Sequence, residues 1–183
     1  CDDDDCPIPI YSVREEIFKS VLEFVYTVKT PEIETEAFAM ELLVAADRFD
    51  CAHLKLYVES ILVDKFLEVG NAAALFIFAD SHSCALLKEA ASNLFVHNVR
   101  QVKQSKGWSQ IRESSQLLEE LLDSLARSKG PMEEYCDSKY DWLDVTTLRT
   151  QLEAAKLELD GSREVLVHRL KNHLESHRME KTI

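Results

Sequence analysis

Apolar residues recur at helical spacing along most of the chain, with charged and polar residues between them. Gly and Pro occur only four times each, and long stretches lack both, which favours uninterrupted helices. The pattern predicts a first amphipathic helix from near Val13 to near Tyr26, because the Thr30-Pro31 step disfavours its continuation. Further helices are predicted over residues 35–50, 52–67, 71–83, 85–105, 106–113 and 114–128.

The helical segments leave little room for strands. The short link at Phe49 and Asp50 predicts an antiparallel hairpin between the second and third helices. No convincing alternation of period two is present, and the one candidate for a short edge strand is PIPIYS at residues 7–12. Aromatic residues on the apolar stripes are assigned to core packing. They are Phe76, Phe78, Phe95 and Trp108.

The end of the chain predicts a separate two-helix unit. The apolar periodicity disappears over residues 128–142, where Gly and Pro interrupt the chain, so this segment is a predicted linker. Asp144 is the predicted N-cap of the next helix, Gly161 supplies the freedom that the turn needs, and Ser162 caps the last helix. The leucines expected to face inward are Leu148, Leu152, Leu166, Leu170 and Leu174, with Leu157 and Leu159 in the turn.

The net charge is negative and unevenly distributed. The chain carries 33 Asp and Glu against 21 Lys and Arg. Residues 1–144 have a net charge of −13, whereas residues 145–183 have a net charge of +1 and three of the six histidines. The negative charge of residues 1–144 should repel nucleic acid, so we expect any contact with phosphates to be confined to residues 145–183. The run of four Asp near the start is interpreted as part of a solvated, disordered segment over residues 1–9.

The remaining composition bears on cellular location. No apolar run reaches the roughly 18 to 20 residues of a membrane span, and no secretory signal pattern is present. Five scattered cysteines favour reduced thiols, and therefore the nucleus or the cytoplasm. A first residue other than Met indicates a fragment or a processed piece.

The sequence offers no catalytic motif. His173 and His177 share a helical face, but the Glu between them departs from the zinc-protease motif HExxH. His82 and Cys84 lack a second ligand pair at zinc spacing, and no Gly-rich phosphate loop or nucleophile elbow is present. We therefore expect a protein that is not an enzyme and that needs no metal or cofactor.

Three stretches resemble the second half of a BTB (POZ) domain and its helical extension, as in the speckle-type POZ and ankyrin-BTB families. They are the helix end FVYT, the hairpin LLVAADRF with the LK after it, and the run from Asn71 to Trp108. The resemblance covers residues 10 to about 127, without a counterpart of the N-terminal half of that fold. Such domains are interaction modules, and many dock a cullin scaffold of an E3 ubiquitin ligase. The resemblance implies a protein partner, with a cullin as the candidate, and a dimer in the full-length protein.

Residues 145–175 resemble the SAP motif, a two-helix module that binds DNA in its family. Eight positions match its pattern: Leu148, Leu152, Leu157, Gly161, Arg163, Leu166, Arg169 and Leu170. The resemblance implies contact with duplex DNA, and the candidate phosphate ligands are Lys156, Arg163, Arg169 and Lys171. Acidic residues lie among them, so weak, salt-sensitive binding is expected. A two-helix clip used for protein contact is the alternative.

The predicted architecture is mainly α: a helical BTB-type half-domain, a helical-hairpin extension and a small SAP-like module. The predicted boundaries are 10–64 for the half-domain, 65–127 for the BACK-like extension, 128–142 for the linker and 143–178 for the SAP-like module.

Three residues are the candidates for a protein-binding face. Tyr26 stands at a helix end, and Phe49 and His53 flank the hairpin corner. Aromatic groups are enriched at interface hot spots, and the BTB resemblance implies that these form a cullin-type face. The alternative is that they close off the core.

Two functional hypotheses follow. The first is a protein-protein interaction module that serves as substrate adaptor or scaffold for a cullin-based E3 ubiquitin ligase. The alternative is a nucleic-acid-binding protein, tethered to chromatin by its SAP-like tail. An exposed apolar groove beside Tyr26 and His53 favours the first, and a basic stripe over residues 145–178 favours the second.

Overall fold

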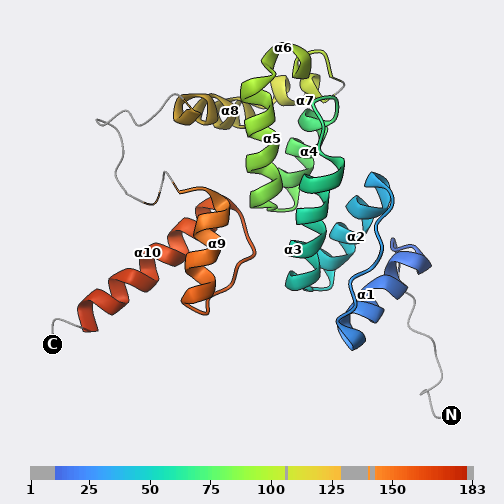
Figure 1. Ribbon diagram of the computed structural model, residues 1–183. Helices are drawn as coiled ribbons and strands as arrows, with labels where there is room; N and C mark the ends of the chain where they lie inside the picture. Colours follow the sequence, from blue (N-terminus) through green and yellow to red (C-terminus); the bar gives the residue numbers. More distant parts are fainter. Residues whose placement is uncertain (1–10, 106, 129–139, 141–142, 181–183) are drawn as a thin grey trace. The chain divides into compact units, whose positions relative to one another are not determined.

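The computed structural model describes residues 11–105, 107–128, 140 and 143–180 (Figure 1). This part of the chain is mainly α, as predicted, and it holds no β-strand. The helices are α1 (Glu15–Thr27), α2 (Glu36–Arg48), α3 (Ala52–Ile61), α4 (Ala72–Ser81), α5 (Ala85–His97), α6 (Val99–Val102), α7 (Trp108–Glu113), α8 (Ser115–Ser128), α9 (Val145–Ala154) and α10 (Arg163–Glu180). A π-helical turn, Leu62–Phe66, extends α3.

Some predictions fall outside the described residues. These are the disordered start over residues 1–9, most of the candidate strand PIPIYS and nearly all of the linker over residues 128–142. None of the helices that the structure describes has the length and apolar character of a membrane span. The chain divides into two compact units after Val58, and the four predicted domain boundaries stay a prediction.

The first unit, up to Val58, contains α1, α2 and the first part of α3. α1 buries Ile17 and Val21, as its apolar spacing predicts. An exposed ion pair between Arg14 Nε and Glu41 Oε2, at 2.6 Å, links α1 to α2. Exposed pairs contribute about 0–1 kcal/mol each, so the buried apolar side chains supply most of the stability here.

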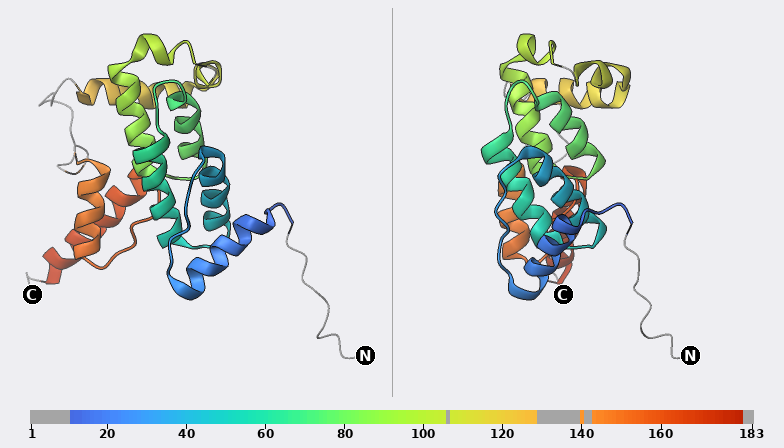
Figure 2. Two further views of the ribbon diagram at one scale, coloured as in Figure 1. Left: turned by 45° about the vertical axis from the view of Figure 1, so that its right-hand side comes forward. Right: turned by 90° about the vertical axis from the view of Figure 1, so that its right-hand side faces the viewer.

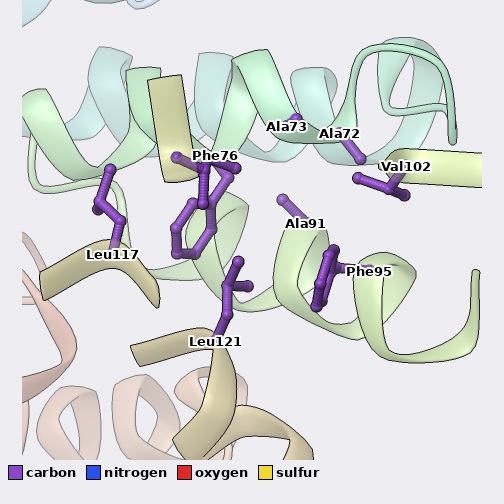
Figure 3. Close-up of a cluster of buried hydrophobic side chains, with 9 residues drawn as sticks. Ala72, Ala73, Phe76, Ala91, Phe95, Val102, Leu117 and Leu121 are labelled. Carbon is purple, nitrogen blue, oxygen red and sulfur yellow. The ribbon is translucent and has the colours of Figure 1, made fainter. Parts of the chain in front are cut away.

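The second unit, from Glu59 onward, is organised around the α4–α5 hairpin, whose helices lie side by side in both views of Figure 2. α7 and α8 pack on this hairpin and close an apolar cluster (Figure 3). Its buried members are Ala72, Ala73, Phe76, Ala91, Phe95, Val102, Ile111, Leu117 and Leu121. Gly107 allows the close approach of α7, because a Cβ there would lie 2.7 Å from the backbone nitrogen of Ala74.

The aromatic residues assigned to the core differ in burial. Phe76 and Phe95 are buried, as predicted. Trp108 is partly buried and stacks on Phe95, with 5.4 Å between ring centroids. Phe78 is half-buried and packs against the ring of His82, with 4.7 Å between centroids. The apolar stripes therefore identified the helices that form the core, but they did not predict how far each aromatic side chain is buried.

The helix predicted over residues 85–105 is interrupted at Asn98. Asn98 has φ −129° and ψ 35°, outside the helical region, and it separates α5 from α6. Its side-chain amide donates a hydrogen bond to Leu94 O at 3.2 Å. Asn side chains compete in this way with the helical hydrogen bonds of the backbone, which explains the break.

The two C-terminal helices form as predicted. Asp144 caps α9, since its carboxylate accepts a hydrogen bond from Thr147 N at 3.0 Å. The leucines at positions 148, 152, 166 and 170 are buried, and Gly161 has φ 124°, which favours glycine. The prediction that Leu174 faces inward is wrong, because α10 runs past the shorter α9 and leaves this side chain 40% exposed.

The α2–α3 and α4–α5 connections repeat one another at an offset of 33 positions. The sequences are ADRFDCAHLK at residues 46–55 and ADSHSCALLK at residues 79–88, here named the first corner and the second corner. Each contains a residue with positive φ, Asp50 at 55° and Ser83 at 54°. In both corners the next cysteine N–H donates to an alanine carbonyl at 2.8 Å, which is the Schellman arrangement.

An ion pair closes each corner. Lys55 Nζ lies 2.8 Å from Asp47 Oδ1, and Lys88 Nζ lies 2.6 Å from Asp80 Oδ1. The cysteine thiol of each corner also donates to the carbonyl two residues earlier, at 3.6 Å in both cases. The two corners therefore share their backbone conformation, their hydrogen bonds and their ion pair.

Candidate functional site

The end of α1 carries an exposed apolar surface. Tyr26 is 82% exposed, Val25 is 54% exposed and Val28 is 76% exposed. The opposite face of the same helix is buried, and Val28 ends the helix in the left-handed region with φ 58°. Tyr26 therefore does not close off the core, and its ring and hydroxyl are available for contact with another molecule.

Phe49 and His53 lie on the first corner. The Phe49 ring is half-buried and packs on Phe18 of α1, with 5.5 Å between centroids. His53 is exposed on the first turn of α3. Among the described residues, no hydrogen bond, ion pair or ring contact joins Tyr26 to either of them. The structure thus places Phe49 and His53 on one corner and Tyr26 on the adjoining helix.

The arginines among the predicted phosphate ligands bind the protein itself. Arg163 Nη2 donates to Leu143 O at 2.8 Å. Arg169 Nη1 donates to Glu158 O at 2.7 Å and to Asp160 O at 3.0 Å. The Arg163 bond ties the start of α10 to the residue before the N-cap of α9, whereas the Arg169 bonds hold the turn between α9 and α10. A phosphate would compete with all of these hydrogen bonds.

The predicted lysines and the surrounding acids complete this surface. Lys156 is exposed at the C-terminal end of α9, with φ 57°, and Lys171 is half-buried on α10. Glu158 Oε2 lies 3.1 Å from Arg169 Nη2 and neutralises it. The described cations of the module are thus interleaved with carboxylates and backbone carbonyls, an arrangement that weakens phosphate binding.

Sequence reasoning missed the role of Glu59, which lies in α3 and is 1% exposed. Its Oε1 accepts hydrogen bonds from Leu86 N at 2.8 Å and Leu87 N at 3.1 Å, at the start of α5. Its Oε2 accepts a hydrogen bond from Arg149 Nη2 at 2.7 Å. One buried carboxylate therefore caps α5 and holds α9 against it.

Further contacts fix the C-terminal module on the second corner and on the following residue of α5. Glu89 Oε2 accepts a hydrogen bond from Val145 N at 2.8 Å, at the start of α9. Cys84 and Gly161 form an isolated parallel bridge. Ala85 belongs to the same apolar cluster as the leucines of the module, and Leu86 packs against that cluster. The C-terminal module is therefore held against the second corner and α5 by the start of α9 and by the turn at Gly161.

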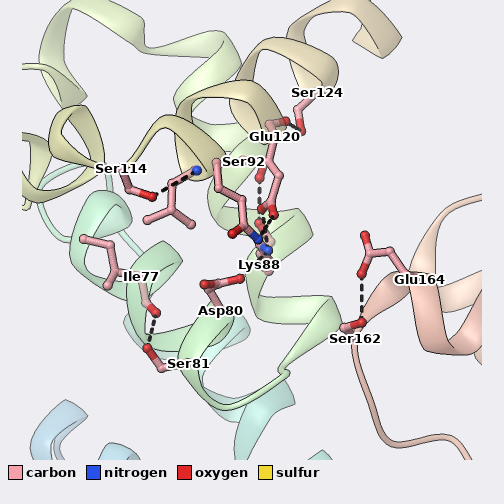
Figure 4. A network of polar contacts seen from close by, with 12 residues as sticks. Ile77, Asp80, Ser81, Lys88, Ser92, Ser114, Glu120, Ser124, Ser162 and Glu164 are labelled. Carbon is pink, nitrogen blue, oxygen red and sulfur yellow. Dashed lines mark hydrogen bonds and ion pairs between the residues drawn. The ribbon is translucent and has the colours of Figure 1, made fainter.

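A cavity of about 280 Å³ opens beside these contacts and is lined by α5, α8 and the starts of α9 and α10. Lys88 on its wall pairs with Asp80 at 2.6 Å and with Glu120 at 2.5 Å (Figure 4). Burial acts to lower the pKa of Lys88, but the hydrogen bonds and charges of both carboxylates outweigh it and raise that pKa. These interactions are internal and join α4, α5 and α8.

The sequence contained one signal for the contact between the second corner and the C-terminal module. The repeated strings at 46–55 and 79–88 identify two equivalent corners, and the SAP-like segment supplies a module for one of them. No local pattern pairs Glu59 with Arg149, because the two lie 90 positions apart.

Comparison with known proteins identifies relatives with a POZ domain. The chain is 33% identical over 124 residues to mouse TD and POZ domain-containing protein 1, covering 67% of the chain and 34% of that protein. It is 34% identical over 116 residues to mouse TD and POZ domain-containing protein 2, covering 63% and 32%. The chain spans about a third of the length of these relatives. No protein-family model matches it. The similarity supports the BTB/POZ part of the resemblance, and the SAP-like part stays a prediction.

Proposed function

We propose that this chain is a protein-interaction module and that it serves as a substrate adaptor or scaffold for a cullin-based E3 ubiquitin ligase. The observation that carries the proposal is the exposed end of α1, where Tyr26 is 82% exposed on a helix whose other face is buried. Tyr26, Val25 and Val28 together form an exposed apolar surface, a feature that marks protein interaction sites, and tyrosine is a frequent hot-spot residue. The similarity to POZ-domain proteins supports an interaction role. A location in the nucleus or cytoplasm stays a prediction from the scattered cysteines.

The proposed contact surface is the end of α1 together with Phe49 and His53 of the first corner. Phe49 is anchored by Phe18, so its exposed edge is held in a fixed position. Tyr26 would supply most of the binding energy, since truncation of a central aromatic residue commonly costs about 2 kcal/mol or more.

The test is capture of the full-length gene product by a purified cullin N-terminal domain. Tyr26→Ala should weaken capture by about thirtyfold, the equivalent of roughly 2 kcal/mol. Tyr11→Ala is the matched control, because Tyr11 is 71% exposed in the same unit and its backbone oxygen keeps the hydrogen bond from Arg48. A folded protein that fails to bind the cullin domain would rule out the adaptor function.

The second candidate function is chromatin tethering through the SAP-like module. It rests on the match to the motif, whereas Arg163 and Arg169 donate to backbone carbonyls of the module itself. Protein contact is therefore the better supported role of this module.

A further inference from the structure

The connection between α1 and α2 lies on the surface and is anchored by one buried side chain. Residues 28–35 form neither helix nor strand (Figure 1). Ile33 is buried and Pro31 is half-buried, so the second half of the connection is attached to the unit. Every residue from 25 to 30 is exposed. The chain immediately before Pro31 is therefore held in place and accessible to another molecule.

Three threonines lie along this connection and at its ends, and two of them serve the helices. The Thr27 hydroxyl donates a hydrogen bond to Glu23 O at 2.5 Å, at the end of α1. The Thr35 hydroxyl accepts a hydrogen bond from Phe38 N at 3.3 Å and caps α2. Thr30, between them, makes no hydrogen bond within the part of the chain that the structure describes. Its exposed hydroxyl therefore has no structural role there.

The residue after Thr30 gives this hydroxyl a chemical context that no other in the sequence shares. Thr30-Pro31 is the one step at which Pro follows Ser or Thr, because the other prolines follow Cys6, Ile8 and Gly130. Pro31 disfavours a helical conformation at Thr30 and has no backbone N–H that needs a hydrogen-bond partner. An exposed, non-helical hydroxyl followed by Pro is the substrate of proline-directed protein kinases.

We infer that Thr30 is a phosphorylation site for a proline-directed protein kinase, and that its phosphate weakens partner binding at the exposed end of α1. The site stands on the geometry of the connection, whereas the effect on binding rests on the proposed function. In the reaction, Thr30 Oγ1 forms a bond to the γ-phosphorus of ATP, the bond from that phosphorus to the bridging oxygen breaks, and ADP leaves. The hydroxyl proton passes to the carboxylate base of the kinase.

The surroundings of Thr30 favour a disruptive effect of the phosphate. α1 has no basic residue in its last turn, and the C-terminal end of a helix already carries negative partial charge. Glu32 and Glu34 are exposed on the other side, and Lys29 is the one cation between residues 20 and 47. A phosphate carries about −1.5 to −2 charges at neutral pH. It therefore adds uncompensated negative charge close in sequence to Tyr26 and Val28, which a partner would have to cover.

The first experiment maps phosphate on the full-length gene product after incubation with a purified proline-directed kinase and ATP, with mass spectrometry of the peptide that contains Thr30. We expect phosphate on Thr30 of the wild type and on the serine of Thr30→Ser. We expect none on this peptide in Thr30→Val or Pro31→Ala. Pro31→Ala keeps the hydroxyl, so it separates recognition of the proline from exposure of the threonine. A synthetic peptide of residues 25–36 shows that the kinase is active.

The second experiment measures capture by the purified cullin N-terminal domain before and after the kinase reaction. Phosphorylation should weaken capture of the wild type by about tenfold or more, because the phosphate must lose water or stay beside the apolar contact. Thr30→Val is the matched control, since it has nearly the same shape and cannot accept phosphate. Its capture should be the same before and after the reaction.

The outcomes separate this inference from the proposed function. Phosphate on the synthetic peptide, with none on Thr30 of the folded protein, would overturn the site. Phosphate on Thr30 with unchanged capture would overturn the effect on binding and leave the adaptor function intact. No capture of the folded, unphosphorylated protein would overturn the adaptor function and the effect on binding together, while phosphate on Thr30 would still support the site.

Discussion

Arg149 and Glu59 form a 2.7 Å ion pair between positions 90 apart in the sequence. The Glu59 side chain is 1% exposed and the Arg149 side chain is 13% exposed, so solvent screens the pair only weakly. Arg149 Nε also donates to Leu159 O at 3.1 Å. The Arg149 guanidinium, on α9, thus links Glu59 of α3 to the turn between α9 and α10.

Removal of Arg149 should destabilise the protein strongly. In Arg149→Ala the Glu59 carboxylate stays buried without its cationic partner, and loss of one partner of a buried pair costs about 3–5 kcal/mol. Urea unfolding of the two proteins measures the difference.

The control for this experiment is Arg112→Ala, because Arg112 is exposed on α7 and its truncation should change the free energy of unfolding by about 0.5 kcal/mol or less. Equal stability of Arg149→Ala and Arg112→Ala would mean that the module is not held by Glu59.

Gly161 is predicted to tolerate no side chain. Its φ of 124° is a conformation that favours glycine, and a Cβ there would lie 3.1 Å from Val165 Cγ1. Gly161→Ala should cost about 1–3 kcal/mol in thermal or urea unfolding. Gly70→Ala is the matched control, since a Cβ at Gly70 meets nothing within 4 Å. A harmless Gly161→Ala would show that the turn adopts another conformation in solution.

Glu164 should make stability depend on acid pH. Burial acts to raise its pKa, but hydrogen bonds from its own backbone N–H and from Ser162, with the charges of Lys88 and Arg163, hold the pKa below 4.5. Folding therefore favours the charged carboxylate. Its stabilising contribution is present above about pH 4.5 and is lost as the pH falls through the lower folded-state pKa.

The measurement for Glu164 is the free energy of unfolding as a function of pH for the wild type and Glu164→Gln. The wild type should be the more stable at neutral pH, and the two curves should converge in acid. Glu113→Gln, at an exposed glutamate of α7, is the control. Parallel curves for wild type and Glu164→Gln would contradict the assignment.

Apolar spacing predicted the helices well because it reports which face of each segment is buried. It located α1, α2 and the two helices of the module to within a few residues. It missed the break at Asn98, because the competing side-chain hydrogen bond there depends on the local backbone path. It also placed Leu174 inward, because spacing within α10 does not show where the neighbouring α9 ends.

The candidate site was only partly predictable. Exposure of Tyr26 agrees with a contact role, but the sequence alone also allowed a core role. The SAP-like motif could not predict that Arg163 and Arg169 donate hydrogen bonds to backbone carbonyls. A sequence motif specifies residue types at given positions, but it does not specify their hydrogen-bond partners. The repeat of the two corners was readable in the sequence, but the module bound to one of them was not.

The last prediction concerns duplex DNA. Binding by the full-length protein should be no tighter than about 10⁻⁴ M at physiological salt, the weak end of non-specific binding, because the body is acidic and two of the candidate cations bind the module itself. Fluorescence anisotropy with a labelled duplex at two salt concentrations measures it. Micromolar binding with a steep salt dependence would instead establish the DNA-binding role. In that case, binding should weaken in Lys171→Ala and Arg163→Ala and stay unchanged in Arg112→Ala, since Arg112 lies outside the module.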